Sequence, residues 1–249
     1  QKTTNNLLTK NKATMKKLFT ILAVAAAMVS CAKEDVVSVS RDAAIAFDGI
    51  FVENATRAND PSTTADNINE FYVWAVIENE TGIVFDDEKV WKSGDSWTYN
   101  ETQQWVPDHH YYFSAIAGVR TNNQIVLDLA AEKDNGMSLE GLGTATFTNV
   151  DGTNDFLYAE YEVKTPKAIT TTPEAVKFQF NHLLSKVKFT FENGFVNDNN
   201  TIVVKNVKMT APKSGVIDLT KAYAWTDHDG VVELDFGHMA GATRVAMGK

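Results

Sequence analysis

Short runs in which apolar and polar residues alternate are the feature that most constrains how this chain can fold. They recur along the sequence between clusters of Gly, Asn and Asp, whereas apolar residues at helical spacing are scarce. Alternation with a period of two places successive side chains on opposite faces of a β-strand. Many short strands of this kind predict an all-β chain of antiparallel sandwiches, and they argue against a parallel α/β sheet.

The clearest alternation lies in residues 176–180 (VKFQF) and 187–191 (VKFTF). Each stretch is expected to bury one apolar face, and residues 181–185 would form a compact crossover between the two strands. Strand 70–77 is apolar on both faces, which predicts a central position in its sheet. The other predicted strands are 43–52, 111–117, 124–129, 156–163, 201–210 and 231–236.

The composition changes at residues 164–173, which hold two prolines and four threonines and are typical of a linker. This predicts an N-terminal β-sandwich over 70–163 and a C-terminal β-sandwich over 174–249. The second sandwich is expected to be incomplete, because 243–249 contain no closing strand. The polar stretch 53–69 separates the first strand from the rest of the chain.

The first thirty residues carry a different charge from the rest and are expected to have a separate role. They contain five lysines and no acidic residue, whereas the remaining residues carry 18 basic and 32 acidic side chains, a net charge of −14. Residues 18–29 form a largely apolar run, shorter than the ~20 residues that span a bilayer. We therefore interpret 15–30 as a signal peptide and 1–14 as an over-extended gene start.

The signal peptide ends in Met-Val-Ser30-Cys31, which resembles a bacterial lipobox. In such a signal the thiol is acylated with diacylglycerol, and the signal peptidase cuts between Ser30 and Cys31. The alternative is an ordinary signal peptide with an accidental cysteine. Because Cys31 is the only cysteine, the chain cannot form an internal disulfide or a thiolate zinc site. Residues 31–69 would then comprise a lipid tether, the first strand and an exposed loop.

The sequence offers no signature of catalysis, metal binding or nucleic-acid binding. Nucleophile-elbow, zincin, Walker and dinucleotide motifs do not occur, and the net charge of −9 disfavours a phosphate-binding surface. Adjacent His109 and His110 would face opposite sides of a strand, and His182 is expected to be structural. The stretch 227–230 is expected to be a plain turn rather than part of a calcium loop. We expect no enzyme activity, no metal and no cofactor apart from the lipid on Cys31.

Four stretches together resemble the Bacteroidetes fimbrillin-like proteins, which include major and minor fimbrial subunits and related surface lipoproteins. The most specific is Phe178-x-Phe-x-His-x-x-Ser-Lys-Val-x-Phe189, in which aromatic, histidine and alternating apolar positions follow a fixed order. The other three are the lipobox, the series 71–77, 97–99, 105–108 and 111–115, and the stretch 155–159.

The resemblance implies two tandem transthyretin-like sandwiches and assembly by strand exchange. A trypsin-like protease would release the first strand, here 44–52, and a strand of the next subunit would fill the groove that it leaves. The candidate cleavage site lies between Arg57 and Ala58. Arg41 is an alternative, but it precedes the strand.

The resemblance thus implies a structural or adhesive subunit of bacterial fimbriae, as shaft, tip or anchor. We expect an outer-membrane lipoprotein at the cell surface, anchored through Cys31. Its partners would be other fimbrial subunits, the membrane, and a host protein or glycan. The alternative is a non-polymerising surface lipoprotein that binds glycans through exposed Trp and Tyr. In a sandwich of short strands, however, the five tryptophans are more often core residues.

Overall fold

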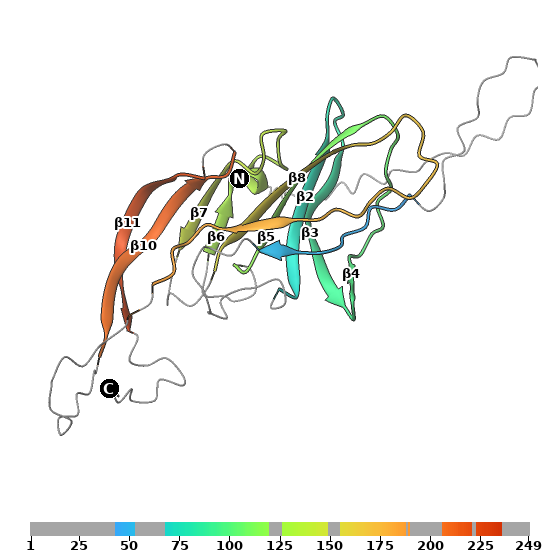
Figure 1. The fold of residues 1–249 in the computed structure, drawn as a ribbon. Coiled ribbons are helices and arrows are strands. Elements are labelled where there is room, and N and C mark those ends of the chain that lie inside the picture. Colours follow the sequence, from blue (N-terminus) through green and yellow to red (C-terminus); the bar gives the residue numbers. More distant parts are fainter. Residues whose placement is uncertain are drawn as a thin grey trace, which may run out of the picture. The chain divides into compact units, whose positions relative to one another are not determined.

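The computed structural model describes residues 43–52, 68–119, 126–148, 155–187, 189, 206–220 and 223–235, all within one compact unit. The strands in chain order are β1 (Phe51–Val52), β2 (Glu70–Ile77), β3 (Ile83–Ser93), β4 (Ser96–Thr98), β5 (His110–Ala117), β6 (Val126–Leu129), β7 (Thr144–Thr148), β8 (Leu157–Lys164), β9 (Gln179–His182), β10 (Lys208–Asp218) and β11 (Trp225–Asp235), and a short helix α1 (Ala130–Lys133) follows β6 (Figure 1). The predicted all-β class is confirmed. No helix within the described ranges is long and apolar enough to cross a bilayer.

The strands form two sheets. One has seven strands in the order β1-β9-β8-β5-β2-β3-β4, and the other has four in the order β11-β10-β7-β6. All pairings between these described strands are antiparallel except that of β1 with β9, which is parallel. Strand β2 lies between β5 and β3, so its predicted central position is confirmed, and the physical reason is its two apolar faces.

The two faces of β2 belong to two different cores. Phe71, Val73 and Ala75 point into a core that also contains residues of β3, β5 and β8, and we call this the aromatic core. Trp74 and Val76 point to the other side, where they pack with residues of the four-stranded sheet. Strand β2 therefore forms part of the wall between two buried layers.

The paired strands predicted at 176–180 and 187–191 are only half correct. Val176, Phe178 and Phe180 are buried in the aromatic core, as expected. In contrast, Val187 is 43% exposed and Phe189 40% exposed, so these two residues are not buried as expected, and residues 188, 190 and 191 lie outside the described part of the chain. The strands that pair with β9 come from elsewhere in the chain: β1 pairs with Gln179–Phe180, and β8 pairs with Asn181–His182.

Strands from both sides of the predicted linker 164–173 share the seven-stranded sheet. Strand β9 pairs with β8, and Ile169 is completely buried in the aromatic core. The division into two sandwich domains stays a prediction.

The four-stranded sheet differs in detail from the predicted strands. Strand β10 covers Lys208–Asp218 and overlaps the predicted strand 201–210 at 208–210, whereas residues 201–205 lie outside the described part of the chain. Residues 227–230, predicted as a turn, lie inside strand β11, where Asp227 and Gly230 have positive φ angles of 43° and 62°. The strand is therefore locally irregular, which is how a turn-forming sequence is accommodated within it.

Candidate functional site

Residues 43–52, which we call the N-terminal segment, lie in a groove between two other stretches of chain. On one side Trp105 N donates to Ala43 O and Ile45 N donates to Gln103 O, both at 2.8 Å. On the other side Val176 N donates to Ala46 O at 2.7 Å, and the segment continues as β1 beside β9. The segment thus occupies the place of a strand, although only Phe51–Val52 are regular strand.

In the first half of the N-terminal segment, buried side chains alternate with less buried ones. Ala43 and Ile45 are 1% exposed and Phe47 is 6% exposed, whereas Ala46 and Asp48 face solvent. The alternation shifts by one residue after Phe47, because the next buried residue is Ile50. Gly49 lies between them with a φ of 63°, a conformation that costs glycine little and other residues more.

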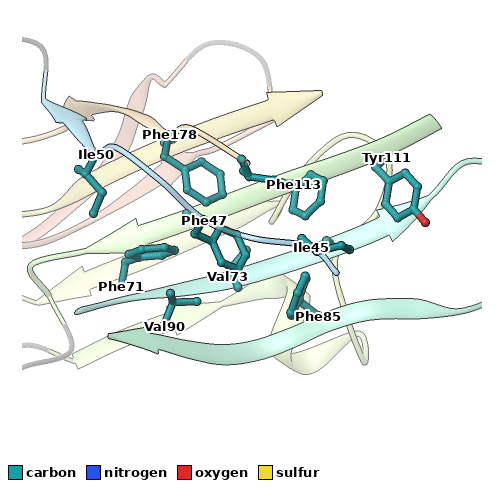
Figure 2. Packing of buried hydrophobic residues seen from close by; sticks show 14 of the residues in the cluster. Ile45, Phe47, Ile50, Phe71, Val73, Phe85, Val90, Tyr111, Phe113 and Phe178 are labelled. Atoms are coloured by element: carbon teal, nitrogen blue, oxygen red, sulfur yellow. The ribbon is translucent and has the colours of Figure 1, made fainter. Parts of the chain in front are cut away.

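Phe47 is the centre of an aromatic cluster. Its ring centroid lies 5.6 Å from those of Phe71, Phe85 and Tyr99 and 6.0 Å from that of Phe178. Figure 2 shows the Phe47 side chain between Phe71, Phe85 and Phe178. Two of these contacts are edge-to-face, the favourable geometry for aromatic pairs. Phe47 therefore anchors the segment in the groove.

Tyr99 holds the backbone of the N-terminal segment. Its hydroxyl donates to Ile45 O at 2.6 Å and accepts a hydrogen bond from Gln103 N at 3.3 Å. Burial raises the pKa of the Tyr99 hydroxyl above 10.0, so it stays protonated and able to donate even where a free tyrosine begins to ionise. One side chain of the groove thus fixes the position of the segment along its axis.

The tyrosines predict a loss of stability at high pH. Burial is the main cause of raised pKa values at Tyr99, Tyr111 and Tyr223, and the pKa of Tyr223 rises to about 12. In the unfolded chain these groups ionise near 10.0, before they do so in the fold. The free energy of unfolding should therefore be unaffected by them below pH 10 and fall as the pH rises from there through the raised values. Urea unfolding at pH 8 and pH 11 measures this fall, and equal stabilities would contradict it.

The residues predicted for lipidation and cleavage lie outside the part of the chain that the structure describes. These are Ser30, Cys31, Arg57 and Ala58, and the alternative Arg41 lies outside it as well. The described residue nearest to Arg57 on its N-terminal side is Val52, at the end of the N-terminal segment. Lipidation and cleavage therefore stay predictions.

Three of the described histidines, His109, His110 and His182, lie in contacts with acidic side chains. His182 Nδ1 lies 2.7 Å from Asp155 Oδ2, which links β9 to a residue that precedes β8. His109 faces Glu80, whereas His110 faces Glu78 and Glu162. Among the described residues no three His, Cys, Asp or Glu side chains form a group that could hold a metal ion.

Four of the five tryptophans, all except the half-buried Trp91, belong to or pack against the two cores. Trp74 and Trp105 are 0% and 2% exposed, and Trp97 and Trp225 pack against the two cores. The Trp225 indole donates to Leu183 O at 2.8 Å. The expectation that tryptophans fill the core is confirmed for these residues.

Sequence reasoning missed the stretch 103–105 and the role of Tyr99. Residues 101–104 are polar and lack alternation, so nothing in them predicts a strand-like partner for the N-terminal segment. In the sequence, Tyr99 stands out only as the last residue of the stretch 97–99, which belongs to the family resemblance. Their contribution depends on long-range contacts, since Tyr99 and Ile45 are 54 residues apart.

The comparisons with known proteins bear on the family. A family model described as fimbrillin-like matches residues 56–246. No curated protein and no solved structure matches the chain. Because the family model covers most of the chain, including the stretches that form β2 to β11, it decides the assignment: this chain belongs to the fimbrillin-like family.

Proposed function

We propose that the chain is a cell-surface lipoprotein subunit of fimbriae that assembles by strand exchange. Its family already indicates a fimbrial subunit, located at the cell surface and associated with other subunits, in a structural rather than an enzymatic role. The mode of assembly, the lipid anchor and an adhesive role belong to the proposal.

The observation that carries the proposal is the seating of the N-terminal segment. The segment is only ten residues long, and its backbone–backbone hydrogen bonds go to two separate stretches, 103–105 and 176–180. Its removal would expose apolar side chains of the aromatic core and leave backbone groups without partners. An apolar groove with unpaired edges is the arrangement that an added strand fills.

Release of the segment would need a cut between it and β2. Arg57 is the only arginine or lysine in 53–69, between β1 and β2. A cut after Arg57 would separate the N-terminal segment covalently from the rest while leaving the segment in its groove. A strand of a neighbouring subunit could then replace it.

Trypsin treatment of the full-length protein tests this route. We expect a cut after Arg57 followed by a ladder of oligomers in size-exclusion chromatography. Arg57→Gln should abolish both the cut and the ladder, whereas Arg41→Gln should leave them unchanged, because Arg41 precedes the segment. A ladder that forms equally with Arg57→Gln would overturn this cleavage site, and no ladder from the cleaved protein would count against strand exchange.

The lipid anchor has an independent test. In cells given a labelled fatty acid, the wild-type protein should incorporate the label, and Cys31→Ala should lose it completely, because the only thiol is removed. Two or more acyl chains are needed for stable anchoring, so the variant should also leave the membrane fraction. Continued labelling of Cys31→Ala would contradict the anchor, and Ser30→Ala serves as a control that keeps the thiol.

A further inference from the structure

We propose that the groove selects its occupant by one aromatic side chain at the position of Phe47, at a fixed spacing from a small and an aliphatic residue. The occupant would be a strand of a neighbouring fimbrial subunit with the pattern small-x-aliphatic-x-aromatic-x-Gly-aliphatic, which the N-terminal segment shows at 43–50. This inference rests on the proposed function, because it describes the strand that would replace the segment.

The aromatic position is the one at which the groove restricts the side chain of its occupant most strongly. Four rings surround Phe47, and they come from different parts of the chain: β2, β3, the residue after β4, and the stretch before β9. Their positions do not depend on the N-terminal segment alone, because Phe71 also contacts Phe178 at 5.5 Å and Phe85 contacts Tyr99 at 5.3 Å. When the segment leaves, the remaining rings would line a site shaped for a flat aromatic side chain. A small side chain there would leave a cavity.

The two preceding buried positions limit side-chain size. Ala43 and Ile45 are each 1% exposed, and both have a backbone atom tied to 103–105 by a hydrogen bond of 2.8 Å. A larger side chain at either position would have to displace core residues, and overpacking of this kind is unfavourable. The groove therefore distinguishes a small, an aliphatic and an aromatic position in that order.

Tyr99 links the side-chain pattern to the backbone. Its hydroxyl binds Ile45 O, two residues before the aromatic position, and its ring contacts Phe47 at 5.6 Å. A shift of the occupant by one residue would turn its apolar side chains away from the core. A shift by two would place an aliphatic side chain among the rings, so the groove favours one register.

Glycine completes the pattern. Gly49 has a φ of 63°, and beyond it the buried face resumes at Ile50 beside residues 176–180. An occupant without glycine two residues after the aromatic side chain would meet backbone strain at this point. Such a strand would fit the first half of the groove and pair less well with β9.

Peptide binding to the full chain tests the selection. The first acceptor is the full chain with Phe47→Ala, whose own N-terminal segment should compete only weakly with an added peptide for the groove. Trypsin-treated wild-type protein is a second acceptor, in case the variant does not fold. The probe is a fluorescent peptide of residues 41–52 (RDAAIAFDGIFV), and its binding is followed by anisotropy. The competing segment is the same for every peptide on one acceptor, so ratios of apparent affinity report the peptide alone.

We expect the peptide with Phe47→Ala to bind about 100-fold more weakly than the native peptide, and the one with Phe47→Leu about 10-fold more weakly. The peptide with Asp48→Ala should bind like the native one, because Asp48 faces solvent. Equal binding of the native and Phe47→Ala peptides would overturn aromatic selection and leave strand exchange standing. If no peptide binds either acceptor, strand exchange itself fails and this inference fails with it.

Discussion

Phe47→Ala is expected to lower the free energy of unfolding by about 3–5 kcal/mol. The ring is 6% exposed and contacts four other rings, so its removal loses apolar burial and leaves a cavity in the aromatic core. The N-terminal segment should also be released more readily, because Phe47 is its largest described buried side chain. Urea unfolding measures the first effect, and the rate of proteolysis within residues 43–52 measures the second.

The matched control for this variant is Asp48→Ala, the next residue along the same segment. Asp48 is exposed, and its hydrogen bond to Val176 is made by its backbone nitrogen, which the substitution keeps. Its effect should lie within about 0.5 kcal/mol. If Phe47→Ala were no more destabilising than Asp48→Ala, the anchoring role of Phe47 would be wrong.

Gly118→Ala is the second variant for which we expect a large effect, a destabilisation of about 2–4 kcal/mol. Gly118 follows β5 with a φ of +87°, and a Cβ atom there would lie 2.4 Å from the backbone oxygen of Asp155. The added methyl group must therefore push the chain away just before β8. The Asp155 side chain binds His182, so the link to β9 should weaken as well.

Substitutions at two other glycines distinguish the cost of the backbone conformation from the cost of the contact with Asp155. Gly94 has a φ of +63°, but a Cβ atom there would have no atom within 4 Å, so Gly94→Ala should show only the cost of the backbone conformation, about 1 kcal/mol. Gly82 has neither a positive φ angle nor an atom within 4 Å of an added Cβ atom, so Gly82→Ala should be close to neutral. Thermal unfolding of the three variants should give the order Gly118, Gly94, Gly82. Equal effects at Gly118 and Gly94 would show that the contact with Asp155 does not matter.

The agreement between sequence and structure is best where a strand has a strong pattern of its own. Strand β2 matches the predicted bounds, and β5 and β8 differ from theirs by one residue at one or both ends. Prediction fails where pairing decides the outcome. The apolar alternation at 187–191 is as clear as that at 176–180, yet Val187 and Phe189 are exposed, and the strands that pair with β9 are β1 and β8.

At the candidate site, too, local sequence patterns predict some features, whereas long-range contacts decide the others. The sequence predicted a strand at 43–52, and the family resemblance gave this strand a role in assembly. Neither could indicate that Tyr99 binds its backbone, or that it runs parallel to β9. Both features arise from residues distant in sequence, whose proximity local patterns do not encode.

The order of residues along the chain was enough to predict the all-β class, the central strand, the family and a first strand at 43–52. Side-chain periodicity and short motifs suffice for these, because each depends on residues close together in the chain. In contrast, three features emerge only from the folded molecule. They are the stretches that flank the segment, the rings that surround Phe47, and the exposure of Val187 and Phe189. The physical reason is that a strand's neighbours are chosen by competition for backbone hydrogen bonds and apolar surface across the whole fold.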